Sequence, residues 1–322
     1  MRILITGGAG FLGQMLARRL LERGELAGSA GLGRIEQIVL ADQVLAPELG
    51  DSRVRSLVAD LADPTVMAGL IDTGVDLVFH LAAVVSGQAE ADFDLGMRVN
   101  LDASRHLLEQ CRSAGHCPRV IFTSSVAVYG GKLPDLVDDR TLLDPRSSYG
   151  VQKAIGELLL SDYTRRGFVD GRVLRLPTIC VRPGAPNKAA SSFVSGIIRE
   201  PLAGVAAICP VGLDLKLWLL SPAAAIDAII AAAELPSAAF GDRRTLNLPG
   251  LSVTVGQMIQ ALEQAAGRAA VDLIRFERDP AVEAIVGSWP SAWDTRRAEG
   301  LSLKGDRDFA SIIQAYRAHP AS

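Results

Sequence analysis

The chain has 322 residues, of which 49% are hydrophobic and 21% are charged, with a formal net charge of −3. This composition excludes a disordered chain, and the absence of a basic excess argues against a nucleic-acid partner. The four cysteines form no CxxC pair and the four histidines show no metal-ligand spacing, so we expect reduced thiols, no disulfide framework and no metal site. No clean apolar run of about 18 residues is present, which favours a cytoplasmic protein with no membrane partner.

Short apolar segments alternate with helical patterns over the first half of the chain. This alternation predicts βαβ units, and hence an α/β fold with a Rossmann-type doubly wound parallel sheet. The segment 25–37, rich in Gly, Ala and Ser, is expected to be a loop. The predicted strands are 2–6, 37–41, 54–59, 75–80, 120–123 and 172–176, and the predicted helices are 12–21, 64–71, 93–114 and 149–165.

The regular alternation ends near Pro177, and prolines punctuate the remainder of the chain. Only one further helix, at 255–266, has a clear apolar period. We therefore expect an NAD-binding domain at 1–176 and mainly a smaller substrate-binding cap at 177–322, which could return to the sheet in places. Ligands of such sheets bind beyond the carboxyl ends of the strands, where a cap would close the site.

The pattern Gly7-x-x-Gly10-x-x-Gly13 lies between the first strand and the first helix. In this context the three glycines allow, in turn, a tight turn, close approach of the backbone to a pyrophosphate, and packing of the helix on the strand. The helix N-terminus would attract the phosphates. An ordinary glycine-rich turn is the alternative.

Asp42 ends the second long strand, 29 residues after Gly13. A carboxylate there would accept hydrogen bonds from ribose hydroxyls and would repel a 2′-phosphate, which favours NAD over NADP. The alternative is a solvated acid at a strand end.

Tyr149 and Lys153 are four residues apart and therefore share one face of their helix. A tyrosine acting as a base near neutral pH must lose about 2–3 pKa units, which a nearby ammonium and a nicotinamide ring can supply. Thr123-Ser124-Ser125 ends the preceding strand and offers hydroxyl groups to the same crevice. Taken alone, the Tyr/Lys spacing is a common helical pair, and the serines could be an ordinary polar strand end.

Together these motifs resemble the extended short-chain dehydrogenase/reductase family. The matching segments are Thr6 to Gly13, Asp60-Leu61, His80 to Ala83, Asn100, Ser124 to Gly130, Tyr149-x-x-x-Lys153 and the region from Asp294 to Tyr316. The resemblance implies that Ser125 orients a substrate hydroxyl, that Tyr149 is the catalytic base, and that Lys153 binds the nicotinamide ribose and lowers the tyrosine pKa. The implied NAD contacts are Gly7, Gly10, Phe11, Leu12, Gly13, Asp42, Asp60, Leu61, Leu81, Ala82, Asn100, Tyr149, Lys153 and Pro177.

Within that family, the runs 29–37 and 175–192 resemble dehydrogenases of small sugar acids. This likeness implies oxidation of a C2 hydroxyl to a 2-oxo acid with hydride transfer to NAD. Sugar-nucleotide dehydratases carry Asp-Glu where this chain has Val126-Ala127, so dehydration is disfavoured. A nucleotide-sugar 4-epimerase with the same Ser-Tyr-Lys set is the main alternative, and a non-catalytic NAD-binding regulator has no need of Tyr149 and Lys153 together.

A sugar-acid substrate carries a carboxylate, and a buried carboxylate needs a cation or several donors. The segment after the sixth strand supplies Arg182 or Lys188 as the cation, with Asn187 and Thr178 as neutral donors. Ser86 could donate from the opposite wall, while Ser125 and Tyr149 hold the reacting hydroxyl. Either cation could instead be a solvated surface charge. The resemblance also implies a homodimer through helices 93–114 and 149–165.

Overall fold

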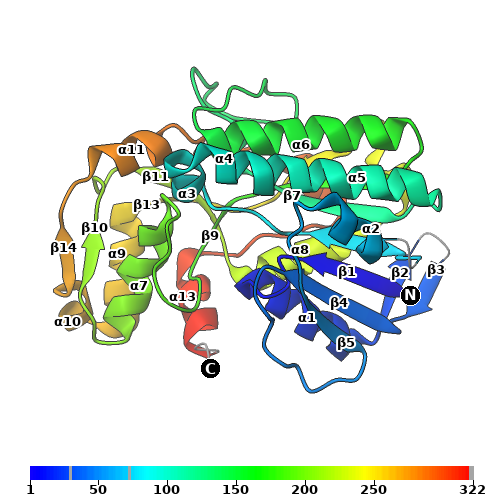
Figure 1. Cartoon of the computed structure of the whole chain (residues 1–322). Helices are drawn as coiled ribbons and strands as arrows, with labels where there is room; N and C mark the ends of the chain where they lie inside the picture. The colour runs from blue at the N-terminus through cyan, green and yellow to red at the C-terminus, as the bar shows by residue number, and fades with distance from the viewer. Residues whose placement is uncertain (29–30, 72–73, 319–322) are drawn as a thin grey trace.

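A parallel sheet of seven strands forms the centre of the computed structural model, which describes residues 1–28, 31–71 and 74–318 (Figure 1). Every pair of neighbouring strands in this sheet is parallel, so the prediction of a Rossmann-type parallel sheet is confirmed. In spatial order the strands are β12 (Thr245–Asn247), β8 (Asp170–Leu176), β7 (Arg119–Ser125), β6 (Leu77–His80), β1 (Arg2–Thr6), β4 (Gln37–Asp42) and β5 (Val54–Val58).

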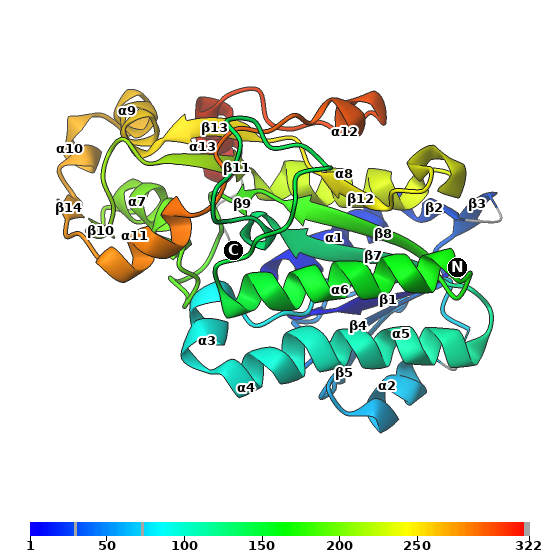
Figure 2. The same cartoon turned by 90° about the horizontal axis from the view of Figure 1, so that it is seen from above.

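Helices cover both faces of the sheet. α1 (Phe11–Arg23) and α8 (Pro222–Glu234) pack together on one face. α2 (Pro64–Ile71), α5 (Ala103–Ala114) and α6 (Ser148–Arg165) cover the other, where Figure 2 shows α5 and α6 side by side. None of the described helices combines the length and apolar character needed to cross a bilayer.

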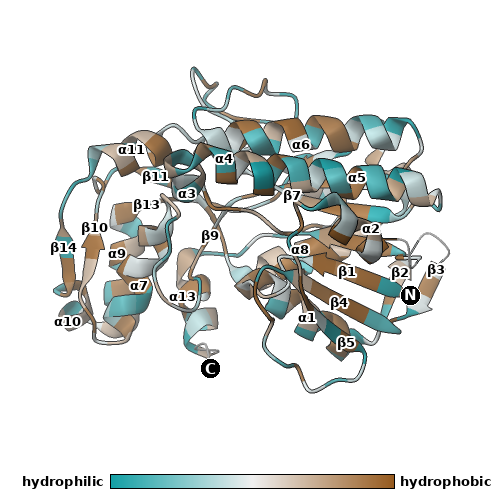
Figure 3. Ribbon diagram, in the orientation of Figure 1, coloured by the Kyte–Doolittle hydropathy of each residue, from teal (hydrophilic) through white to brown (hydrophobic). Residues whose placement is uncertain are grey.

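The apolar runs of the strands reflect this double covering. In β1, Ile3 and Ile5 belong to the core under α1 and α8, whereas Leu4 belongs to the core under α2 and α5. Side chains alternate across a strand, so a strand covered on both faces must be apolar at successive positions. Figure 3 accordingly shows β1 and α8 mostly in the hydrophobic colour.

The C-terminal half forms a second lobe but also contributes to the large sheet. The lobe contains a three-stranded sheet of β13 (Leu251–Thr254), β11 (Lys216–Leu220) and β9 (Thr178–Ile179), and a pair of β10 (Ala207–Cys209) with β14 (Ile274–Phe276). Its helices are α7 (Ser192–Leu202), α9 (Val255–Ala266), α10 (Arg268–Val271), α11 (Pro280–Gly287) and α13 (Phe309–Ala318). In contrast, β12 pairs with β8, and α12 (Arg296–Gly300) contacts β12.

The expectation of one clear helix in this half was wrong, because prolines here mark helix ends rather than interruptions. Pro222 opens α8 directly after its N-cap, where Ser221 Oγ accepts from the backbone N–H of Ala224. A proline is tolerated at the first helical position because its missing N–H would have no intrahelical partner there. Pro201 lies in the last turn of α7.

The expectation of a loop over 25–37 was also wrong. Residues 25–34 contain an antiparallel hairpin of β2 (Glu25–Gly28) and β3 (Gly31–Arg34), whereas Ser29 and Ala30 lie outside the described residues. Leu26 and Ile35 are fully buried and anchor the hairpin to the core. Glycine-rich strands carry almost no alternating apolar signal, which explains why the pattern did not reveal them.

The helix predicted over 93–114 is divided. α3 (Ser86–Ala91) and α4 (Phe93–Gly96) precede a π-helical segment, η1 (Met97–Asp102), which leads into α5. Such segments are rare and frequently mark functional sites. Asn100 lies within this one.

Candidate active site

The glycine-rich turn connects β1 to α1 in a conformation that only glycine adopts without strain. Gly7 has φ +72°, and a Cβ on it would come within 2.8 Å of the backbone N of Ala82. A Cβ on Gly13 would overlap the carbonyl oxygen of Gly7. The N-cap of α1, Gly10, contributes no side-chain hydrogen bond, so the first-turn N–H groups of this helix remain available to phosphate oxygens.

Two adjoining pockets follow the carboxyl ends of the strands and share Gly7, Gly10, Leu81 and Ala83. We name them after the expected cofactor contacts: the pocket lined by Asp42 and Asp60 is called the adenine-side pocket, and the pocket lined by Tyr149 and Lys153 is called the reaction pocket. The first is lined by the predicted residues Asp42, Asp60, Leu61 and Ala82. The second is lined by the predicted residues Phe11, Leu12, Gly13, Ser86, Ser125, Tyr149, Lys153, Pro177, Thr178, Arg182 and Asn187.

Ser125, Tyr149 and Lys153 meet in the reaction pocket from two elements. Ser125 ends β7, while Tyr149 lies in the first turn of α6, whose N-cap Ser147 accepts a hydrogen bond from the N–H of Gly150. Lys153, one turn further along α6, is 2% exposed, and its Nζ donates to the carbonyl oxygen of Thr123 at 2.9 Å. The same Nζ lies 5.9 Å from the centroid of the Tyr149 ring.

Burial shifts both ionisable groups toward their neutral forms. It lowers the pKa of Lys153 to about 8, with Glu157 acting in the opposite direction. It raises the pKa of Tyr149 to about 12, against the effect of the Ser125 hydroxyl. With Lys153 Nζ already 5.9 Å from its ring, Tyr149 holds its proton unless further positive charge, such as that of the expected nicotinamide ring, lies beside it.

The predicted substrate contacts separate into two groups. Ser86, Thr178, Arg182 and Asn187 line the reaction pocket, whereas Lys188 lines neither pocket and is exposed. Arg182 Nη2 donates to Asn187 Oδ1 at 3.4 Å, and burial lowers the pKa of this guanidinium. Among the described residues, no carboxylate lies within ion-pairing distance of Arg182.

Comparison with known proteins places this site in a family. The model of the NAD dependent epimerase/dehydratase family matches residues 3–219. The chain belongs to this family. The resemblance inferred from the motifs is thereby confirmed, and NAD is the cofactor.

Two curated relatives match nearly full length. A D-erythronate dehydrogenase of Cupriavidus necator is 63% identical over 98% of both chains, and one of Haemophilus influenzae is 48% identical over 98% of both. Among solved structures, a nucleoside-diphosphate-sugar epimerase from Agrobacterium tumefaciens is 44% identical, with a TM-score of 0.91 over 99% of this chain and 94% of its own.

The adenine-side pocket suits the NAD of this epimerase/dehydratase family. Asp42 Oδ2 accepts from the N–H of Ala9 at 3.0 Å and Oδ1 from that of Gln43 at 2.7 Å, which fixes the carboxylate beside the glycine turn. A carboxylate has about four acceptor positions, so it can still receive ribose hydroxyls. Asp60, on the same pocket, forms an ion pair with Arg98 at 2.7 Å.

Asn100 does not line either pocket, although the family resemblance implies a cofactor contact. It is 1% exposed and holds the loop after β6, accepting from the N–H of Val84 and donating to its carbonyl oxygen. Its amide also donates to Gln152 Oε1, next to Lys153 on α6. Val84 itself lines the adenine-side pocket.

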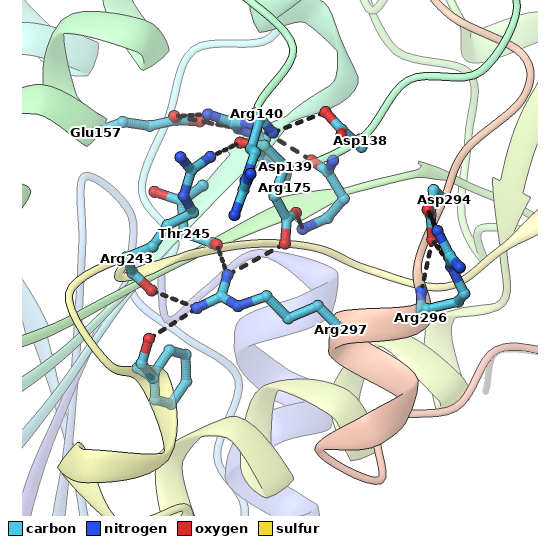
Figure 4. A network of polar contacts seen from close by, with 12 residues as sticks. Asp138, Asp139, Arg140, Glu157, Arg175, Arg243, Thr245, Asp294, Arg296 and Arg297 are labelled. Atoms are coloured by element: carbon cyan, nitrogen blue, oxygen red, sulfur yellow. Dashed lines mark hydrogen bonds and ion pairs between the residues drawn. The ribbon is translucent and has the colours of Figure 1, made fainter.

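Glu157, which the sequence reasoning missed, lies behind the reaction pocket. It is 2% exposed, accepts a hydrogen bond from Ser124 Oγ, and pairs with Arg175 at 2.6 Å (Figure 4). Arg175 donates to the hydroxyl of Tyr129. The signal was available, because Glu157 follows Lys153 by four residues and so shares its helix face.

This buried network continues to the surface of the molecule. Tyr129 donates to Asn247 Oδ1 at 3.1 Å, and the N–H of Asn247 donates to Asp139. Asp139 in turn pairs with Arg297 of α12 at 3.1 Å (Figure 4). The contacts tie β12, α12 and the segment after η2 (Val126–Val128) to the sheet end that carries Ser125.

Several pocket residues escaped the sequence analysis because they belong to no local motif. Trp289, which follows α11, and Ser191, which precedes α7, both line the reaction pocket. Their position depends on how the second lobe folds back over the sheet. No spacing rule along the chain would have found them.

Proposed function

We propose that this chain oxidises the C2 hydroxyl of D-erythronate to 2-oxo-D-erythronate, with NAD as hydride acceptor. The two curated relatives, at 63% and 48% identity, carry the name of this activity. The observation that carries the proposal is the placement of Ser125, Tyr149 and Lys153 in one pocket with a guanidinium that has no carboxylate partner among the described residues.

In the proposed reaction, the Ser125 hydroxyl orients the C2 hydroxyl and the Tyr149 oxygen takes its proton. Bound NAD supplies the acceptor for the hydride that leaves C2, so the alcohol loses two electrons and becomes a ketone. The Lys153 ammonium stabilises the tyrosinate, because positive charge nearby lowers the pKa of a phenol. The bond from Lys153 Nζ to the Thr123 carbonyl fixes this charge at the end of β7.

Arg182 is the cation that we assign to the substrate carboxylate. Burial disfavours its charge, and a bound carboxylate would compensate through charge-assisted hydrogen bonds. Asn187 and Thr178 line the same pocket and supply neutral hydrogen-bonding groups. Ser86 of α3 also lines this pocket, and its Oγ accepts from the N–H of Ala190 at 3.3 Å.

The direct test is NADH formation, measured by absorbance, with D-erythronate and a panel of other sugar acids and nucleotide sugars. We expect one NADH for each D-erythronate consumed. A second candidate, a nucleotide-sugar 4-epimerase, is favoured by the name of the Agrobacterium tumefaciens structure. Interconversion of nucleotide sugars with no net NADH, and no reaction of D-erythronate, would establish that alternative instead.

We further propose that the protein acts as a cytoplasmic homodimer through the face formed by α4 and α6. Three apolar side chains are exposed there: Phe93 (59%), Val151 (42%) and Leu158 (67%). Val151 and Leu158 are seven residues apart and lie on one side of α6, as a helix interface requires. Light scattering should give twice the monomer mass, and Leu158→Glu should shift it toward the monomer.

A further inference from the structure

A second, narrow cavity adjoins the reaction pocket at Trp289. Trp289 lines both spaces, together with Val126 and Thr178, which also border each of them. The narrow cavity has no room for a water molecule. Beyond Trp289 it is lined by Lys216, Leu217, Trp218, Val286 and Pro290.

The surroundings of Trp289 hold it in this position. It packs against the buried cluster of Trp218, Trp293 and Tyr129, and also against the core of the second lobe. Its backbone N–H donates to the carbonyl oxygen of Val286 at 3.3 Å, at the end of α11. A tryptophan fixed by packing on two sides forms a firm end to a pocket, because protein interiors yield little to added volume.

We propose that Trp289 limits the length of the substrate carbon chain by closing the reaction pocket against the narrow cavity. This inference rests on the proposed function. A four-carbon acid that is held at its reacting end by Ser125 and Tyr149 has a short tail, whereas longer acids would meet the indole. Removing the indole would join the two spaces, and the joined space would extend toward Lys216, a polar group suited to additional hydroxyls.

The test compares kcat/KM for D-erythronate with kcat/KM for five- and six-carbon aldonates in wild-type enzyme and Trp289→Ala. When a substrate is one methylene too long for a closed pocket, its kcat/KM falls by about 10–200-fold relative to the substrate that fits. We therefore expect the four-carbon preference of the wild type to fall by at least about 10-fold in Trp289→Ala. Trp289→Phe, a smaller change, should weaken the preference less and provides a second variant should the alanine form fold poorly.

Trp293→Phe is the matched control. Trp293 belongs to the same aromatic cluster, with its ring 5.1 Å from that of Tyr129, but it does not line the reaction pocket. It should alter stability without altering the length preference. The KM for NAD should stay unchanged in each variant.

The outcomes separate the inference from the proposed function. Wild-type enzyme that oxidises D-erythronate but shows no four-carbon preference overturns the role of Trp289 alone, as does an unchanged preference in both Trp289 variants. Wild-type enzyme that oxidises no sugar acid overturns the proposed function, and the inference with it. If the four-carbon preference weakens equally in Trp293→Phe, the role of Trp289 is also overturned, because looser packing of the whole aromatic cluster would then be the cause.

Discussion

The two walls of the reaction pocket are built in different ways. The sheet wall carries Ser125, Tyr149 and Lys153 on the end of β7 and the start of α6. Two of these side chains are bonded to buried backbone groups: Lys153 Nζ donates to the Thr123 carbonyl, and Ser125 Oγ accepts from the N–H of Ala127. The cap wall carries Arg182 and Asn187 on a segment without regular structure between β9 and α7. The only polar contact from the Arg182 guanidinium among the described residues is the 3.4 Å bond to Asn187.

Under the proposed function, the sheet wall carries the chemistry and the cap wall carries substrate recognition. Groups that transfer a proton must hold a fixed geometry, and strand ends backed by a buried network provide it. Groups that bind a substrate need hydrogen-bond donors or acceptors that are not already bonded to the protein. Variants of the sheet wall should therefore affect turnover or folding, whereas variants of the cap wall should affect KM and substrate choice.

The largest effect is expected on the sheet wall from Tyr149→Phe, which removes the phenolic oxygen with little change in volume. Turnover with D-erythronate should fall by about 10²–10⁴-fold, the usual contribution of a positioned general base. NAD binding, measured by calorimetry, should be retained. Near-normal turnover would remove Tyr149 from the mechanism, and the sheet wall would then no longer differ from the cap wall in its chemical role.

The next effect concerns stability beside the sheet wall, in β6, which pairs with β7. His80 at the end of β6 is 1% exposed and bonded through Nδ1 to Thr6 Oγ1 at 2.7 Å and through Nε2 to Ser104 Oγ at 2.9 Å. Burial, aided by Lys153, lowers its pKa to about 3. The folded protein thus keeps His80 neutral at a pH where the unfolded chain, with a pKa near 6.5, is already protonated.

Proton binding by the unfolded chain lowers the stability of the folded protein at acidic pH. Between pH 6.5 and 3 the imidazole of His80 binds a proton in the unfolded state but not in the folded state. The contribution of His80 to the free energy of unfolding is therefore present above pH 6.5 and is lost as the pH falls. The loss from His80 alone should reach roughly 3 kcal/mol at pH 4.5. The free energy of unfolding, measured in urea, should decrease from pH 7 to pH 4.5 in both proteins. The decrease should be smaller by about this amount in His80→Gln than in wild type, because the carboxylates titrate equally in both proteins. Equal losses would contradict a buried neutral His80.

The same contrast explains what the sequence could predict. Gly7, Gly10 and Gly13, like Tyr149 and Lys153, are local patterns whose geometry is set within one turn or one helix, and the parallel sheet follows from the alternation of short elements. Residues such as Trp289 and Arg175 reach the site or its supporting network through contacts between distant segments. The hairpin strands β2 and β3 were missed because glycine-rich strands carry little apolar alternation. The helices of the second lobe were missed because proline interrupts a helix in its interior but is tolerated at its ends.

Arg182 and Lys188 show this limit most clearly, since both are cations of one short segment and only the fold distinguishes them. The backbone of Lys188 lies against α3, where a Cβ on Gly87 would overlap its carbonyl oxygen, while its side chain is exposed. The backbone N–H of Arg182 instead donates to the buried Ser195 Oγ at 3.0 Å, and its side chain lines the pocket.

The smallest effect should therefore come from substitutions of these two cations. Arg182→Ala should raise KM for D-erythronate by about 10–100-fold, corresponding to the roughly 1.5–3 kcal/mol of a charged hydrogen bond. Lys188→Ala, the matched loss of one positive charge six residues away, should leave KM within about twofold, because an exposed charge is screened by solvent. The neutral polyol erythritol, which lacks the carboxylate, should be a poor substrate for wild type, and Arg182→Ala should discriminate less between acid and polyol. If Lys188→Ala raised KM and Arg182→Ala did not, the cap wall would have to rearrange when the substrate binds. The few hydrogen bonds of this segment would then allow it to close over the substrate, and Arg182 would not bind the carboxylate.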